Sequence, residues 1–212
     1  MLHILKACMM ATGFALVVSG GSQSQELPAE FLVVSDADIE FLTTRGDFRH
    51  SDWSDAAERN LETALLAELS GSRLILSSQT AECLDQGNNR QAILLAKTIA
   101  VSVDEPRFTD HLEGFTLGAG IARLQACADF QKLALISHDA SLASSGTILA
   151  SVAAAALTGF NADRDQYSRT RLDIFDGRTG QLMTHIDVSG GDARSEEGAA
   201  RLVERLISEW GQ

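Results

Sequence analysis

The spacing of the apolar residues changes abruptly at Ser51, and this change limits what the chain can fold into. Residues 31–34 form a short apolar run bounded by polar residues, which is typical of a buried strand. Beyond Ser51 the apolar side chains recur every three or four residues. They form one helical stripe made of Trp53, Ala57, Leu61, Ala64, Leu65 and Leu69. A strand that leads into an amphipathic helix indicates a layered α/β fold.

The same two spacings recur along the rest of the chain. We expect the first strand to stay extended as far as Phe41 and to turn at Arg45–Asp47, and the first helix to be capped by Ser51 or Asp52. We expect further strands and helices at 73–77, 80–103 with a break near 87–89, 118–127, 130–136, 167–175, 181–188 and after the N-cap Ser195. Asp176–Gly180 is a hairpin turn, because its glycines accept positive φ. This order predicts a single α/β domain, a mixed sheet of about five strands with helices packed on it and an amphipathic C-terminal helix.

The N-terminus has the layout of a secretory signal peptide. A cationic start ending at Lys6 precedes an apolar stretch and a tail of small residues, so we expect residues 1–24 to be cleaved and residues 25–212 to form the domain. Cleavage after Gly21 is the nearest alternative, and an uncleaved anchor is another. Val18–Gly21 resembles a lipoprotein box but has Gly21 where the lipidated cysteine belongs. We therefore expect a soluble periplasmic protein that is not a lipoprotein.

The charge balance excludes nucleic acid as a partner. The chain has 29 Asp and Glu residues against 17 Lys and Arg residues, for a formal net charge of -12. Binding to phosphates needs a cationic face that releases counterions. The apolar runs are also too short for a transmembrane helix.

Cleavage of the leader would leave two cysteines, Cys83 and Cys127. In an oxidising compartment these two thiols can form one disulfide. Two separate buried thiols are the alternative, because cysteine is among the most buried residue types.

Neither a metal site nor a cofactor is predicted. The histidines His50, His111, His138 and His185 are isolated, with no partner at ligand spacing. Asn161, Asp163 and Asp165 occupy the first, third and fifth positions of a calcium loop. Gln166 and Leu172 replace its essential glycine and glutamate, so we interpret this segment as a solvated loop.

No catalytic residue is predicted either. Ser144 and Ser145 precede Gly146 without the strand–turn–helix pattern of a serine nucleophile. His138 and Asp139 are neighbours in a strand, so their side chains should point to opposite faces. Residues 118–123 begin like a dinucleotide-binding loop, but Arg123 replaces the third glycine and we expect only the start of a helix.

Two further segments are interpreted from their composition. The arginines after residue 160 are offset by nearby aspartates, so we expect exposed cross-strand pairs among Arg164, Arg169, Arg171, Arg178, Asp165, Asp173 and Asp176. Residues 144–160 are small, apolar and uncharged. They predict a helix buried in the core, or alternatively an insert that contacts a membrane or a partner.

Several short motifs resemble a family of uncharacterised proteobacterial envelope proteins, many of which are lipoproteins. The motifs are Trp53-x-x-x-Ala57-x-x-Asn60-Leu61, Thr116-Leu117-Gly118, Ala128-Asp129-Phe130, Ser144-Ser145-Gly146, Asp176-x-Arg178-Thr179-Gly180 and Gly191-Asp192-x-Arg194. The expected architecture also resembles the periplasmic domain of the curli secretion channel and the N-terminal domain of the Tol–Pal β-propeller protein. The resemblance implies an interaction or assembly role in the envelope without enzymatic activity. The alternative is a periplasmic ligand-binding protein or hydrolase whose site combines distant residues such as His111, His138 and Asp139.

Overall fold

A mixed six-stranded sheet lies at the centre of the structure, a computed structural model that describes residues 29–43, 46–104, 112–143 and 166–210. The order along the sheet is β2–β1–β4–β5–β6, and β3 pairs with β1 on the side of β2. β1 runs parallel to β3 and β4, whereas the other neighbours are antiparallel. The strands are β1 (Ala29–Thr43), β2 (Gly46–Arg49), β3 (Leu74–Leu76), β4 (Phe130–Ala143), β5 (Tyr167–Asp176) and β6 (Leu182–Ser189).

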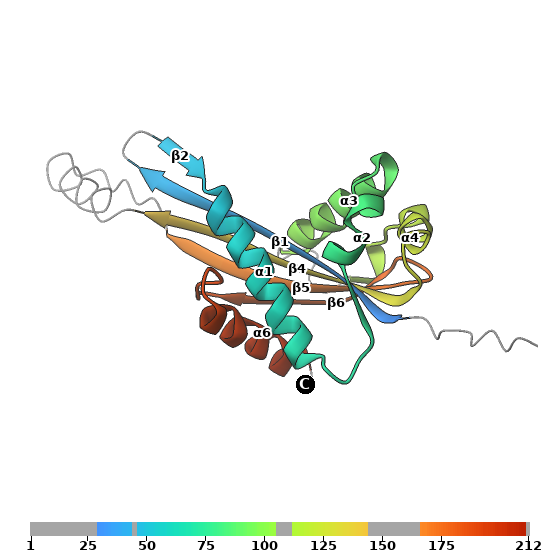
Figure 1. Cartoon of the computed structure of the whole chain (residues 1–212). Coiled ribbons are helices and arrows are strands. Elements are labelled where there is room, and N and C mark those ends of the chain that lie inside the picture. Colours follow the sequence, from blue (N-terminus) through green and yellow to red (C-terminus); the bar gives the residue numbers. More distant parts are fainter. Residues whose placement is uncertain (1–28, 44–45, 105–111, 144–165, 211–212) are drawn as a thin grey trace, which may run out of the picture.

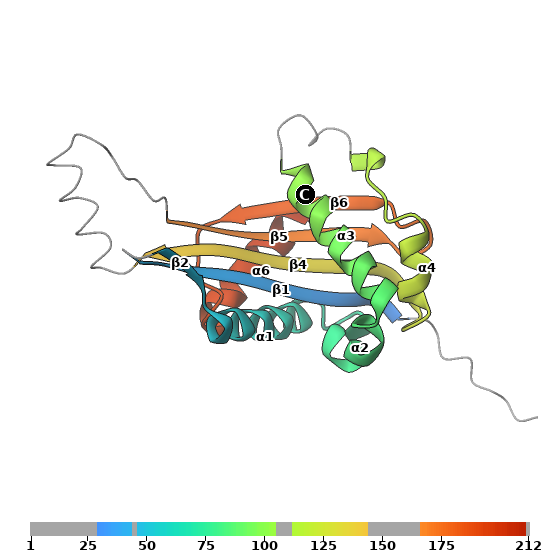
Figure 2. The same cartoon turned by 90° about the horizontal axis from the view of Figure 1, so that it is seen from above.

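Helices cover both faces of this sheet (Figure 1). One face carries α1 (Ser51–Glu68) and α6 (Glu196–Trp210). The other face carries α2 (Ser77–Leu84), α3 (Gly87–Val103) and α4 (Ala119–Gln125), with a short 3₁₀ turn at Leu112–Gly114. Figure 2 shows α3 crossing the sheet obliquely, from the end near α2 and α4 toward β5 and β6.

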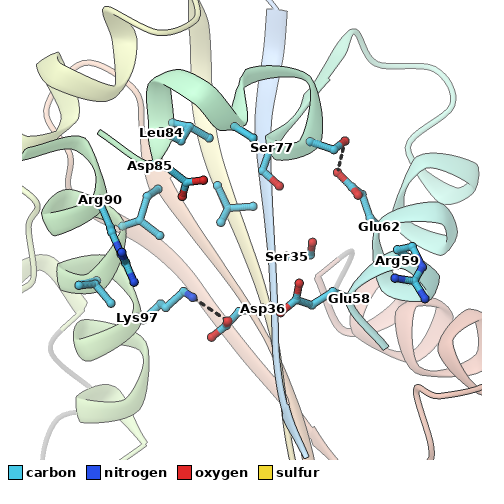
Figure 3. A pocket seen from close by; sticks show the side chains of 15 residues that line it. Ser35, Asp36, Glu58, Arg59, Glu62, Ser77, Leu84, Asp85, Arg90 and Lys97 are labelled. Carbon is cyan, nitrogen blue, oxygen red and sulfur yellow. Dashed lines mark hydrogen bonds and ion pairs between the residues drawn. The ribbon is translucent and has the colours of Figure 1, made fainter. Parts of the chain in front are cut away.

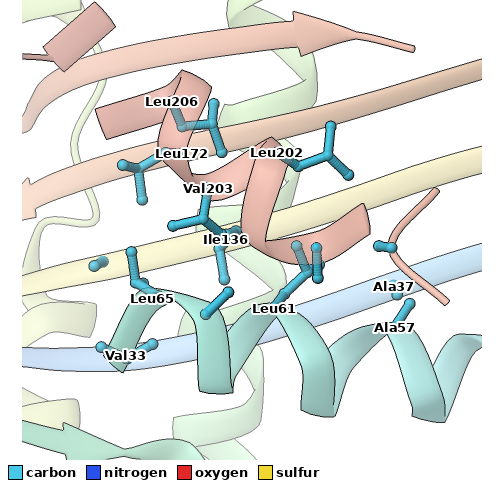
Figure 4. Close-up of a cluster of buried hydrophobic side chains, with 14 of the residues drawn as sticks. Val33, Ala37, Ala57, Leu61, Leu65, Ile136, Leu172, Leu202, Val203 and Leu206 are labelled. Carbon is cyan, nitrogen blue, oxygen red and sulfur yellow. The ribbon is translucent and has the colours of Figure 1, made fainter. Parts of the chain in front are cut away.

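Two hydrophobic cores follow from the alternation of side chains along β1 and β4. Phe31 and Val33 face α1 and α6, whereas Leu32 and Val34 face α2, α3 and α4. This burial on both faces explains why residues 31–34 form a continuous apolar run. Figure 4 shows the first core, in which Leu61 of α1 and Leu202 of α6 lie over the sheet.

The expected fold class is confirmed, and the differences have local causes. The sheet has a sixth strand, β2, because the four residues of Gly46–Arg49 pair with β1 as a hairpin although they have no apolar alternation. β4 continues to Ala143, beyond the expected end at 136, because it pairs with β1 and β5 along its polar half as well. The expected cap of α1 is wrong: His50 is the N-cap residue, and its side chain makes no capping hydrogen bond. Ser195 does accept a hydrogen bond from the Gly198 amide, at 3.1 Å.

Cys83 and Cys127 form a disulfide, which resolves the choice between pairing and separate thiols. The bond joins α2 to the segment between α4 and β4. The Asn89 side-chain amide supports the same junction, since it donates a hydrogen bond to the Cys83 carbonyl oxygen at 2.9 Å.

Residues 144–160, the signal peptide region 1–24 and the calcium-loop positions Asn161, Asp163 and Asp165 lie outside the described residues. None of the helices within the described ranges is long and apolar enough to span a bilayer.

The disulfide closes a loop of 44 residues, and cross-links of this length restrict the unfolded chain by about 4 kcal/mol. The double variant Cys83→Ser with Cys127→Ser should therefore lose about 4 kcal/mol of unfolding free energy in urea titrations followed by circular dichroism. Added reductant should lower the stability of the wild type to the same level and leave the double variant unchanged. Equal stability of the oxidised and reduced wild type would contradict the prediction.

Candidate functional site

The edge of β1 is open between its two short neighbours. β3 pairs with residues 31–33 and β2 with residues 40–43, so no strand among the described residues pairs with the intervening backbone on this side. Side chains occupy part of this edge. Ser54 Oγ accepts a hydrogen bond from the Ile39 amide at 3.1 Å, and Glu58 Oε1 accepts one from the Ala37 amide at 3.2 Å.

The backbone of Ser35 points to the same open edge. In a strand with one parallel neighbour, every second residue directs both its N–H and its C=O away from that neighbour. Ala37 and Ile39 do so, because their amides and carbonyls bond to groups outside β4. The same alternation directs the Ser35 amide and carbonyl outward.

A cleft of about 700 Å³ adjoins Ser35, with α1 on one side and α2 and α3 on the other (Figure 3). β3 ends beside it at Leu76, and α2 begins directly afterwards with Ser77. Ligands of open α/β sheets bind in crevices beyond the carboxyl ends of strands, and this cleft has that position relative to β3.

The walls of the cleft carry charges of both signs. Lys97 Nζ lies 2.6 Å from Asp36 Oδ1, and Ser78 donates a hydrogen bond to Glu62 at 3.3 Å. Burial raises the pKa of the Glu58 carboxyl above its usual range, although the bond from the Ala37 amide opposes the shift.

Two cleft arginines remain without a carboxylate. Arg59 on α1 and Arg90 on α3 line opposite walls (Figure 3). Neither forms an ion pair in the part of the chain that the structure describes. The arrangement can hold an anionic group between two guanidinium groups, beside Ser35.

A second set of polar residues gathers on the opposite half of the sheet, where the end of α3 covers β4, β5 and β6. We call it the charge network, and its members are Asp104, Asp139, Arg169, Arg171, Asp173, His185 and Asp187. Arg171 lies at its centre with its side chain only 8% exposed; it bonds to Asp104 Oδ2 at 2.7 Å and to Asp139.

His185 lies between two carboxylates of this network. Its Nδ1 is 2.7 Å from Asp173 Oδ1, and its Nε2 is 3.2 Å from Asp104 Oδ1. Burial alone would lower the pKa of the imidazole, but the bond to Asp173 and the surrounding negative charge outweigh it and raise the pKa. Burial raises the pKa of the Asp173 carboxyl, which is fully inaccessible to solvent.

The charge network corrects the interpretation of these charges as exposed cross-strand pairs. Arg171 and Asp173 are buried, because α3 ends over the face of β5 that carries them. Arg169 is half-buried and bridges Asp104 and Asp187. Only Arg178, beside the turn residue Asp176, is exposed as expected; Arg164 and Asp165 lie outside the described residues.

The three residues suggested for a composite hydrolase site do not converge. His138 and Asp139 point to opposite faces of β4, as predicted: His138 Nδ1 is 2.8 Å from Thr170 Oγ1 on the α1 and α6 side, while Asp139 pairs with Arg171 on the other. His111, like Ser144, Ser145 and Gly146, lies outside the described residues. Gly118, with φ of +50°, begins the short helix α4, so the start of a helix is confirmed there.

Two of the short sequence motifs contact each other. The Asn60 side-chain amide on α1 donates hydrogen bonds to the carbonyl oxygens of Ala193 and Arg194, at 3.1 and 2.9 Å. Arg194 pairs with Asp192 and lies over the Trp53 ring, 4.6 Å from its centroid. His50 also stacks on the Trp53 ring, with the two ring centroids 3.9 Å apart. The motifs therefore tie the start of α6 to α1.

The sequence predicted neither the charged walls of the cleft nor the charge network. The alternation of Arg169, Arg171 and Asp173 with the uncharged residues 170, 172 and 174 does mark one charged face of β5. Asp104 completes the network from a distant helix end, and no local pattern connects it to that face.

Comparisons with known proteins add no family assignment. No protein-family model matches the chain, and no curated protein matches its sequence significantly.

Removing the central guanidinium of the charge network should destabilise the fold. Arg171→Met should lower the free energy of unfolding by about 3 kcal/mol, because Asp104 and Asp139 lose their shared counter-charge in a largely buried position. Urea unfolding measures the loss. Arg201→Met is the matched control: its i,i+4 pair with Glu197 is exposed, so it should cost less than about 0.5 kcal/mol. Similar losses in the two variants would refute the interpretation.

His138 should make the protein less stable in mild acid. Burial lowers the pKa of its imidazole below 6.5, so as the pH falls through 6.5 the unfolded chain takes up a proton that the folded chain does not. This group alone then reduces the unfolding free energy by up to about 1.4 kcal/mol per pH unit. Denaturant unfolding between about pH 7 and pH 5 should show a shallower dependence for His138→Gln than for the wild type. The same slope in both proteins would count against this assignment.

Proposed function

We propose that the chain is an exported binding protein of the cell envelope, and that the cleft between α1, α2 and α3 holds its partner. The observation that carries the proposal concerns Arg59 and Arg90, which line opposite walls of the cleft. Neither arginine forms an ion pair among the described residues. Guanidinium groups bind carboxylates through paired, charge-assisted hydrogen bonds, and in this cleft that capacity is unused within the described residues.

The partner that fits this cleft is an extended segment of another envelope protein with an acidic side chain. Its carboxylate would lie between Arg59 and Arg90. Its backbone would bond to the outward amide and carbonyl of Ser35, as in the addition of a short strand to an open sheet edge. Ala37 and Ile39 are already bonded to α1 and its neighbours, so the added pairing is brief and the arginines supply the selectivity.

Two features support an envelope location. Residues 1–24 have the pattern of a cleavable secretory signal. The disulfide between Cys83 and Cys127 suits an oxidising compartment. We propose binding rather than catalysis because two of the carboxylates in the cleft are already engaged by neighbouring side chains. Asp36 forms an ion pair with Lys97, and Glu62 accepts a hydrogen bond from Ser78.

A photo-crosslinking amino acid at Leu94 tests the proposal. Leu94 is exposed and lines the cleft, whereas Val101 is exposed on the same helix without lining it. In envelope preparations the probe at position 94 should capture a protein that the probe at position 101 does not. The captured protein, once purified, should bind the Arg59→Glu and Arg90→Glu variants roughly tenfold more weakly than the wild type.

Arg123→Glu provides the matched charge reversal, because Arg123 is exposed on α4 away from the cleft. It should bind the captured protein like the wild type. Capture at both positions alike, or equal weakening by all three reversals, would reject the cleft as the binding site.

A further inference from the structure

Three residues of the charge network offer ligand atoms to a common point. One carboxylate oxygen from each of Asp104 and Asp187 and one ring nitrogen of His185 lie within 4.8 Å of one another. His185 Nε2 and Asp104 Oδ1 are 3.2 Å apart. Two ligands bound to one ion at about 2.1 Å each have this separation.

His185 is oriented as metal-binding histidines are. Its Nδ1 bonds to Asp173 Oδ1 at 2.7 Å, and Asp173 is fully buried. When Nδ1 carries the proton, it donates to this carboxylate and leaves a lone pair on Nε2, which faces Asp104. A carboxylate behind the histidine fixes the ring and its tautomer in the same way at many metal centres.

The two carboxylates are held from behind by arginine. Arg169 bonds to Asp104 Oδ2 at 2.9 Å and to Asp187 Oδ2 at 2.8 Å, and Arg171 adds a bond to the same oxygen of Asp104. The other oxygen, Asp104 Oδ1, bonds to neither arginine but lies 3.2 Å from His185 Nε2, and its side chain is only 10% exposed. It has no hydrogen-bond partner among the described residues. A buried carboxylate oxygen without a donor is costly, and a bound cation would relieve that cost.

The formal charges leave room for a divalent ion. The charge network contains four carboxylates and two guanidinium groups, so its carboxylates outnumber its arginines by two. A divalent cation at the common point would offset this excess.

We propose that Asp104, His185 and Asp187 bind a divalent transition-metal cation, such as Zn²⁺ or Mn²⁺. The imidazole favours these ions over Mg²⁺ and Ca²⁺, which prefer oxygen ligands alone. Asp173, Arg169 and Arg171 act as positioning residues that hold the ligands. Three protein ligands leave coordination positions for water or for an external ligand. This site is separate from the cleft and extends beyond the proposed binding function.

Titration of the tag-free, chelator-treated protein with zinc, manganese or magnesium chloride, followed by isothermal calorimetry, tests the proposal. Zinc or manganese should bind with one equivalent, and magnesium at least tenfold more weakly. Asp187→Asn should weaken zinc or manganese binding at least tenfold. Asp187 is half-buried, so the isosteric variant should keep its fold, as circular dichroism will verify. Asp192→Asn, which removes an exposed carboxylate paired with Arg194, should bind metal like the wild type.

A cobalt-loaded sample gives an independent spectroscopic test. Co²⁺ should produce visible absorption bands that shift or disappear in His185→Gln and persist in His50→Gln. The proposal is overturned if neither zinc nor manganese binds with one equivalent, or if Asp187→Asn binds them as tightly as the wild type. It is equally overturned if the cobalt bands are the same in His185→Gln, because the ion would then bind elsewhere.

Discussion

The parallel pairing of β1 with β4 is the constraint on which the other parts of the molecule depend. It runs from Ala29 with Phe130 to Leu42 with Ala143, nearly the full length of both strands. Because β1 and β4 are central, each contributes side chains to both cores, and helices on both faces must bury them. The pairing also places the two candidate sites. The cleft lies at the free edge of β1, and the charge network begins on β4 at Asp139.

The charge network is unusual in its setting, since helix-covered sheet faces normally bury apolar groups. On the same face, Leu133 and Leu135 pack under the helices, whereas Arg171 bonds to Asp104 at the end of α3 and to Asp139, and Asp173 bonds to His185. Both guanidinium groups bond to carboxylates, Arg169 to Asp104 and Asp187 and Arg171 to Asp104 and Asp139, so the cost of removing these groups from water is partly offset. Asp104 thus joins the end of α3 to β5 through ion pairs with Arg169 and Arg171, in addition to the apolar contacts of Val103 in the second core.

Much of the fold could be predicted from the sequence, and the sites could not. The helical stripe of α1 and the hairpin turn at Asp176 are local patterns whose physical cause lies within a few residues. The strand β2 was not predicted, because Gly46–Arg49 is short and pairs with β1 mainly through its backbone. The charge network was not predicted, because alternation shows which residues share a face of a strand but not which element covers that face. In addition, Asp104 is distant in the chain from the other members of the network. The cleft depends on β3 being only three residues long, which composition does not reveal.

The disulfide affects how firmly α2 is held beside the cleft. Cys83 belongs to α2, and Ser77, Ser78 and Leu84 of that helix form one wall of the cleft. Without the disulfide, packing, the hydrogen bond from Ser78 to Glu62 and the bond from Asn89 to the Cys83 carbonyl hold this short helix in place. Closing the bond restricts its freedom to move away from the sheet. The oxidation state of this single cysteine pair therefore determines how freely one wall of the cleft can move.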